Sequence, residues 1–137
     1  MQSSLRQVRL IQIAMLVCIA MYVAVGELVT HRATPNTRLF YALSFLSISM
    51  VGAILVVRRT LVSQSEVQLL KSPDDAMILS RWRAGYITTY AMCEALALVG
   101  LVLRLAGFTL SQVWPYYLGG FALLSMFVAR PPRAEES

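Results

Sequence analysis

The sequence has 137 residues, 58% of them hydrophobic and 14% charged, with a mean hydropathy of +0.65. Soluble domains are about half apolar and about a quarter charged, so this composition excludes an ordinary soluble domain, a disordered chain and a collagen. Two cysteines exclude a disulfide scaffold, and the net charge of +5 comes from basic residues at the ends of apolar runs, so nucleic-acid binding is not expected.

Four apolar runs are long enough to cross a bilayer, which takes about 20 helical residues. The first is too long for the apolar core of a signal peptide. We therefore expect an all-α membrane protein in which residues 1–130 form a single domain of four transmembrane helices. A disordered polar tail is expected over residues 131–137. The predicted spans are residues 8–29, 39–57, 84–106 and 110–129.

Lysine and arginine are distributed unevenly between the two ends of these runs. Nine of them lie at the N-terminus, at the C-terminus and in the connection between the second and third runs, whereas three lie in the other two connections. Basic residues are retained on the cytoplasmic side of membrane proteins. Both termini and the long connection are therefore expected in the cytoplasm, with the protein in the cytoplasmic (inner) membrane.

The long connection at residues 58–83 is predicted to be helical. Its first half lacks Gly and Pro, and its second half begins with a helix-start signal, in which Ser72 is the N-cap, Pro73 the first helical residue and Asp75 an acid of the first turn. The pattern predicts helices over residues 36–70 and 73–106, each longer than the bilayer by about 15 Å. They would form an antiparallel cytoplasmic hairpin, closed on its inner face by Leu61, Val62, Leu69, Leu70, Met77 and Ile78.

Glu94 lies at the midpoint of the third run, where a carboxylate costs about 2.5–3.5 kcal/mol. Because the membrane interior penalises charge, the neutral acid is the expected resting form. One interpretation is a group that binds and releases a proton. The other is a permanently protonated clamp that hydrogen-bonds a neighbouring helix, with Ser47, Ser49 or Tyr90 as the partner.

Glu27 and Arg104 form a second pair of candidates. Glu27 lies near the outer end of the first run and Arg104 near the outer end of the third, each about twenty positions from the inner end of its helix. Matching depths predict a structural salt bridge between them. The alternative is that each side chain reaches the outer headgroups separately.

No pattern in the sequence indicates catalysis. There is no phosphate-binding loop, nucleophile elbow or metal-ligand spacing. Cys18 and Cys93 lie inside apolar runs, and His31 is the single histidine. Asp74 and Asp75 suit the start of a helix better than a divalent ion. We therefore expect no enzyme activity, no cofactor and no metal.

The residues around Glu94 also form a recognisable pattern. Residues 94–102 read Glu-Ala-Leu-Ala-Leu-Val-Gly-Leu-Val, Arg83 lies eleven positions before the acid, and Pro73-Asp74 precedes it. Residues 73–103 thereby resemble the carboxylate-bearing helix of the rotary ATP synthase and ATPase proteolipids, the c-subunit family. The resemblance implies that Glu94 is the ion-binding carboxylate of an oligomeric ring. The sequence departs from that family in carrying Ser47, Ser49 and Gly52 where alternate glycines stand, and in having Arg104 on the acid-bearing helix.

Three functions are compatible with these features. The first is a non-catalytic structural or accessory subunit of a membrane complex, which binds the lipid bilayer and either a protein partner or further copies of itself. The second is a proteolipid-like, ion-binding subunit that uses Glu94. The third is a small dimeric exporter, although the uneven distribution of basic residues disfavours insertion in both orientations.

Overall fold

The computed structural model describes residues 2–29 and 34–128, so the tail expected at residues 131–137 lies outside it. Every regular element within the described residues is helical, which confirms the all-α prediction. The elements are α1 (Gln2–Leu28), α2 (Thr37–Val57), the π-helical segment η1 (Arg58–Ser63), α3 (Gln64–Lys71), α4 (Ala76–Leu105) and α5 (Leu110–Met126).

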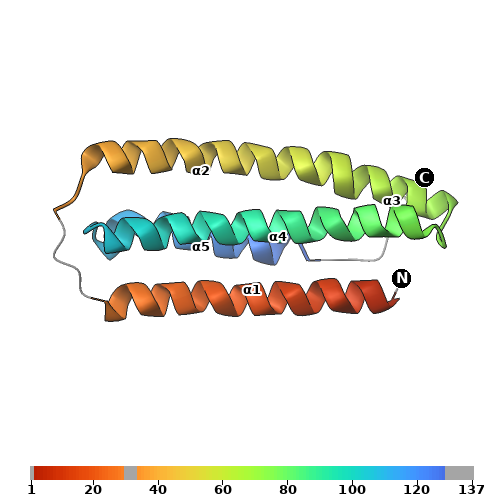
Figure 1. Cartoon of the computed structure of the whole chain (residues 1–137), viewed down its shortest axis with the longest axis horizontal. Coiled ribbons are helices and arrows are strands. Elements are labelled where there is room, and N and C mark those ends of the chain that lie inside the picture. Colours follow the sequence, from red (N-terminus) through yellow and green to blue (C-terminus); the bar gives the residue numbers. More distant parts are fainter. Residues whose placement is uncertain (1, 30–33, 129–137) are drawn as a thin grey trace.

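The helices run along the long axis of the molecule, and α5 lies behind α4 in this view (Figure 1). Segments α2, η1 and α3 are one continuous helix of 35 residues, Thr37–Lys71, as predicted for residues 36–70 from the absence of Gly and Pro in residues 60–70. This helix, α1 and α4 are long and apolar enough to cross a membrane. Helix α5 has 17 residues, which is about 25 Å at 1.5 Å per residue, so its membrane crossing remains a prediction.

The start of α4 differs from the prediction. Asp75, not Ser72, is the N-cap, and its carboxylate accepts hydrogen bonds from the amides of Met77 and Ile78. Ser72 instead ends α3, where its amide donates to the carbonyl of Gln68. A helix starting at Pro73 would leave a single residue to reverse the chain. The turn therefore takes Pro73 and Asp74, and Asp75, the residue that follows them, caps α4.

The inner face of the hairpin between α3 and α4 is smaller than predicted. Val62 and Leu69 are buried and Leu61 and Ile78 half-buried, but Leu70 is 44% exposed and Met77 82% exposed. The prediction for these last two residues is wrong. Consecutive helical residues point about 100° apart, so Leu70 is turned away from the buried face that holds Leu69, and Met77 lies in the first turn of α4, near the tip of the hairpin.

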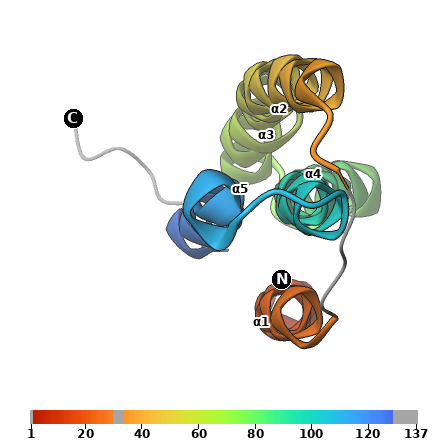
Figure 2. The ribbon, with the colours of Figure 1, turned by 90° about the vertical axis from the view of Figure 1, so that its left-hand side faces the viewer.

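Helix α4 is the centre of the bundle and packs against every other helix. Viewed from one end, α1 and α2 lie on opposite sides of the α4–α5 pair (Figure 2). Two clusters of buried apolar side chains lie along α4, one toward each end of the helix. The cluster at the hairpin end surrounds Trp82, Tyr86 and Tyr90. The cluster at the other end surrounds Leu103 and Tyr117. We call this second end, which carries Glu27 and Arg104, the ion-pair end.

Large apolar side chains cover the outside of the bundle. On α2, Phe45 is 75% exposed and Ile48 is 72% exposed, and α1 exposes Leu10, Ile13 and Val17. Such faces destabilise a protein in water but are neutral against lipid chains. Together with the three long apolar helices, they indicate a membrane-associated protein.

Candidate functional site

Glu94 lies at the interface between α4 and α1. The phenol of Tyr22, on α1, donates a hydrogen bond to Glu94 Oε1 with an oxygen-to-oxygen distance of 2.5 Å. Both side chains are half-buried. Glu94 thus has a polar partner on a neighbouring helix and an edge that reaches the surface of the bundle. Either a proton-exchanging acid or an interhelical clamp is chemically possible with this geometry.

The partners that the sequence suggested for Glu94 make other hydrogen bonds. The hydroxyl of Ser47 donates to the carbonyl of Leu43 at 2.8 Å, and that of Ser49 donates to the carbonyl of Phe45 at 3.0 Å. Serine in a transmembrane helix commonly bonds the carbonyl four residues earlier in this way. Because these bonds lie within α2, matching depth did not make the two serines interhelical partners.

Tyr90 has a different structural role, at the C-terminal end of α5. Its hydroxyl donates to the carbonyl of Phe127 at 2.6 Å, and Gln12 on α1 donates through Nε2 to the carbonyl of Leu124 at 2.8 Å. Carbonyls in the last turn of a helix lack partners inside the helix, so α1 and α4 together cap α5. The sequence analysis missed Gln12, although an amide inside an apolar run is a signal for helix–helix bonding.

A cation also lies at this end of α5. The guanidinium of Arg58 lies over the ring of Phe127, 4.2 Å from its centroid, and 5.7 Å from the centroid of Tyr86. A cation near the carbonyl end of a helix is favoured by the helix dipole, and its contact with the aromatic faces adds to this. Arg58, the first residue of η1, therefore contacts the end of α5 at the hairpin end of the bundle.

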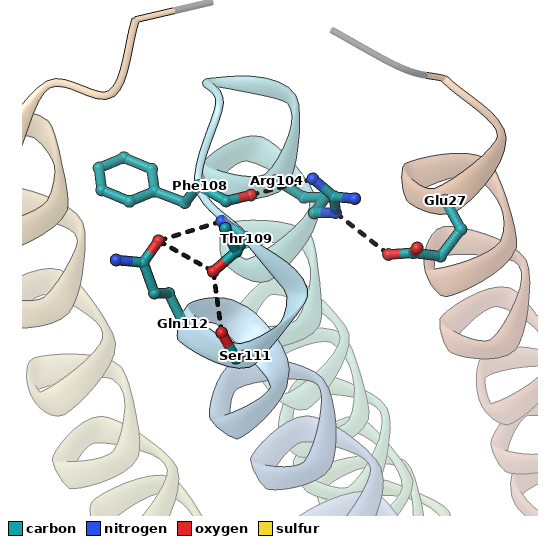
Figure 3. Close-up of polar contacts among 6 residues, drawn as sticks. All are labelled: Glu27, Arg104, Phe108, Thr109, Ser111 and Gln112. Carbon is teal, nitrogen blue, oxygen red and sulfur yellow. Dashed lines mark hydrogen bonds and ion pairs between the residues drawn. The ribbon is translucent and has the colours of Figure 1, made fainter. Parts of the chain in front are cut away.

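The ion pair expected between Glu27 and Arg104 is present in the structure (Figure 3). Arg104 Nε lies 3.1 Å from Glu27 Oε1, and Arg104 Nη1 donates to the carbonyl of Phe108 at 3.1 Å. The side chains are 26% exposed for Arg104 and 42% for Glu27. This half-open position is that of a structural contact between α1 and α4 rather than of an enclosed transport site.

The turn between α4 and α5 holds the arginine in place. Gly107, with a φ of 103°, allows its own amide to bond the carbonyl of Arg104 and that of Phe108 to bond the carbonyl of Leu103, which is a Schellman motif. Thr109 and Gln112 then form a capping box that starts α5 (Figure 3). Two consecutive caps therefore orient the carbonyl of Phe108 toward Arg104.

The ion pair is expected to add little stability because both of its side chains are partly exposed. Glu27→Gln and Arg104→Gln, made singly and together, should give a coupling free energy of about 0.2–1 kcal/mol. Salt should reduce this value. Unfolding of the detergent-solubilised protein at low and high NaCl measures it. Arg38→Gln, which removes an exposed arginine from α2, is the control. A coupling energy of zero at low salt would contradict the prediction.

The remaining candidates lie apart from one another. Cys18 on α1 is half-buried and Cys93 on α4 is buried, both as free thiols. Within residues 2–29 and 34–128, no three His, Cys, Asp or Glu side chains gather as a metal site would require. No protein-family model matches this chain, and no curated protein or solved structure matches it either.

Proposed function

We propose that this chain is a multi-pass protein of the cytoplasmic membrane, with α5 as its fourth span. Both termini and the α3–α4 hairpin would lie in the cytoplasm. The nine-to-three distribution of basic residues supports this orientation. The positions of Arg38 and Arg58 support the crossing of the membrane by α2, because they bracket a stretch about as long as the bilayer is thick.

Within that orientation, we propose that the protein is a non-catalytic accessory subunit whose hairpin binds a partner protein. The observation that supports this function is a set of apolar side chains at the tip of the hairpin. Val67, Leu70 and Met77 are 56%, 44% and 82% exposed. Val67 and Leu70 are three residues apart, so they share one face of α3.

This tip lies beyond the membrane-spanning part of the helices. Val67 lies eight residues after the exposed Arg59, or about 12 Å further along a helix axis. Large apolar side chains on a short polar hairpin are unfavourable in water, and such patches mark protein–protein contacts. A partner that covers the tip would remove these side chains from water.

The test is chemical cross-linking in intact membranes, followed by purification of the protein and analysis of its cross-linked products. We expect a specific product with the native sequence, and a loss of at least about tenfold when Val67, Leu70 and Met77 are all changed to Gln, since each buried apolar side chain contributes about 1.5–3 kcal/mol. The matched control is Gln68→Ala, which changes an exposed polar residue of α3. An equal yield from the triple variant would overturn the docking proposal.

A second candidate function rests on Glu94. Its carboxyl group is half-buried, and its edge reaches the surface between α4 and α1. That position gives a proton or cation a route to it from outside the bundle. It is compatible with the proteolipid-like, ion-binding subunit that the sequence resemblance implies. Reactivity toward a carbodiimide, which modifies protonated carboxyl groups, tests this candidate.

A further inference from the structure

A groove of about 510 Å³ runs between α1 and α5 on the outside of the bundle. Its walls are α1 residues between Ile19 and Val23 and α5 residues between Leu110 and Phe121. Ala20, a small and exposed side chain, lies in the α1 wall of the groove. Trp114, Leu118 and Phe121 are 50%, 54% and 45% exposed along it.

The length of the groove indicates what fills it. From Leu110 to Phe121 the axis of α5 advances by about 16 Å, roughly half of the 30 Å hydrocarbon core. The groove begins at Leu110, the first residue of α5, at the ion-pair end of the bundle. A groove that starts at one interface and stops near the midplane matches one leaflet, and therefore one lipid chain.

The ion-pair end of the groove carries an unsatisfied polar group. Tyr117 is only 6% exposed, and its hydroxyl has no hydrogen-bond partner among the described residues. This hydroxyl and Arg104 Cγ lie 3.0 Å and 3.3 Å from the same point, the position that a Cβ on Gly26 would occupy. The Tyr117 hydroxyl thus lies close to the aliphatic part of Arg104, whose guanidinium binds Glu27 and the carbonyl of Phe108 at the same end of the bundle. Ester and phosphate oxygens accept hydrogen bonds from hydroxyl and guanidinium groups.

We propose that this groove binds one acyl chain of a phospholipid from the leaflet at the ion-pair end. The chain lies against Trp114, Leu118 and Phe121. The ester and phosphate region of the same lipid faces Tyr117 and Arg104. The site goes beyond the docking function of the hairpin, because it lies at the opposite end of the bundle and uses other residues.

The test uses Trp114 as a reporter. The delipidated protein in detergent is titrated with phosphatidylglycerol whose acyl chains carry bromine, a contact quencher of tryptophan fluorescence. The other tryptophan, Trp82, is fully buried at the hairpin end, so the quenched signal comes from Trp114. We expect quenching that saturates at about one lipid per protein, as a single site requires.

Two alanines of α1 provide a matched pair of variants. Ala20→Phe fills the groove and should weaken the saturable quenching at least tenfold. Ala24→Phe adds the same side chain at an exposed position outside the groove and should leave the quenching as in the native protein. Tyr117→Phe should keep a saturable phase with several-fold weaker affinity. Circular dichroism before lipid addition identifies any variant that fails to fold.

Three results would overturn the proposal. One is quenching that rises in proportion to total lipid without saturation, as for lipid that merely surrounds the protein. Another is equal saturable quenching in Ala20→Phe and Ala24→Phe. The third is a native dimer that dissociates in Ala20→Phe, which would show that a second copy covers the groove.

Discussion

Gly120→Ala is expected to destabilise the helix bundle by about 1–3 kcal/mol, as overpacking of a dense interior does. A Cβ at position 120 would lie 2.8 Å from the carbonyl oxygen of Cys93 and 3.2 Å from the amide nitrogen of Ala97. Both atoms belong to the backbone of α4, so no side-chain rotation can relieve the contact. Helices α4 and α5 would have to move apart, which would also loosen the contacts around Tyr90 and Leu124.

The chain supplies a matched control for this substitution. Gly52 on α2 is exposed, and a Cβ there would have no atom within 4 Å. Gly52→Ala should therefore leave stability unchanged or raise it by up to about 1 kcal/mol, the difference in helix propensity between the two residues. Denaturant titration followed by circular dichroism, in the same detergent, compares the two variants. Equal changes in their free energies of unfolding would show that α4 and α5 do not approach closely at Gly120.

The parts of this structure that the sequence predicted depend on local features of the chain. The lengths of the apolar runs predicted the long helices. The absence of Gly and Pro in residues 60–70 predicted that α2 continues as one helix, Thr37–Lys71. The pairing of Glu27 with Arg104 could also be foreseen. In two helices that run in the same direction, residues equally far from the same membrane surface lie at the same height.

What could not be foreseen depends on how the helices are rotated about their axes. Depth alone cannot show whether Tyr22 or Ser47 faces Glu94, because the answer depends on which side of α4 each neighbouring helix packs against. The two serines also had carbonyls of their own helix within reach, at Leu43 and Phe45. A side chain with a partner in its own helix does not need one in another.

The start of α4 shows a different limit of local signals. Ser72 and Asp75 are both good N-cap residues, and residues 72–75 are compatible with either choice. Ser72 is the C-cap of α3, because its amide donates to the last turn of that helix. The chain then needs residues to reverse its direction, so α4 begins after Asp75.

Labelling of Glu94 by a carbodiimide is expected to be abolished by Glu94→Gln, which removes the reactive acid while keeping the size of the side chain. In the native protein, labelling should decline as the pH is raised, because the reagent needs the protonated carboxyl group. Mass spectrometry of the detergent-solubilised protein across a pH series measures the rate at this single position. Glu27, exposed at the ion-pair end, serves as an internal reference for the reagent in water.

Tyr22→Phe separates the two interpretations of this acid. The phenol donates to Glu94 Oε1 at 2.5 Å, so it occupies one oxygen of the carboxyl group. Removing it should increase the labelling rate several-fold, because a hydrogen bond worth about 0.5–1.5 kcal/mol no longer has to be broken before the reagent reacts. Tyr41→Phe, on an exposed face of α2, should have no effect.

The pH series and the tyrosine variant together decide what Glu94 does. Rapid labelling of the native protein that depends on pH would mean that the acid exchanges protons with its surroundings. The ion-binding function would then be favoured over a purely structural one. Slow labelling of the native protein that is independent of pH, and that becomes rapid only in Tyr22→Phe, would mean a permanently protonated clamp that the Tyr22 hydrogen bond maintains between α1 and α4. In that case the hairpin tip, rather than the membrane interior, is where the function of this protein must be sought.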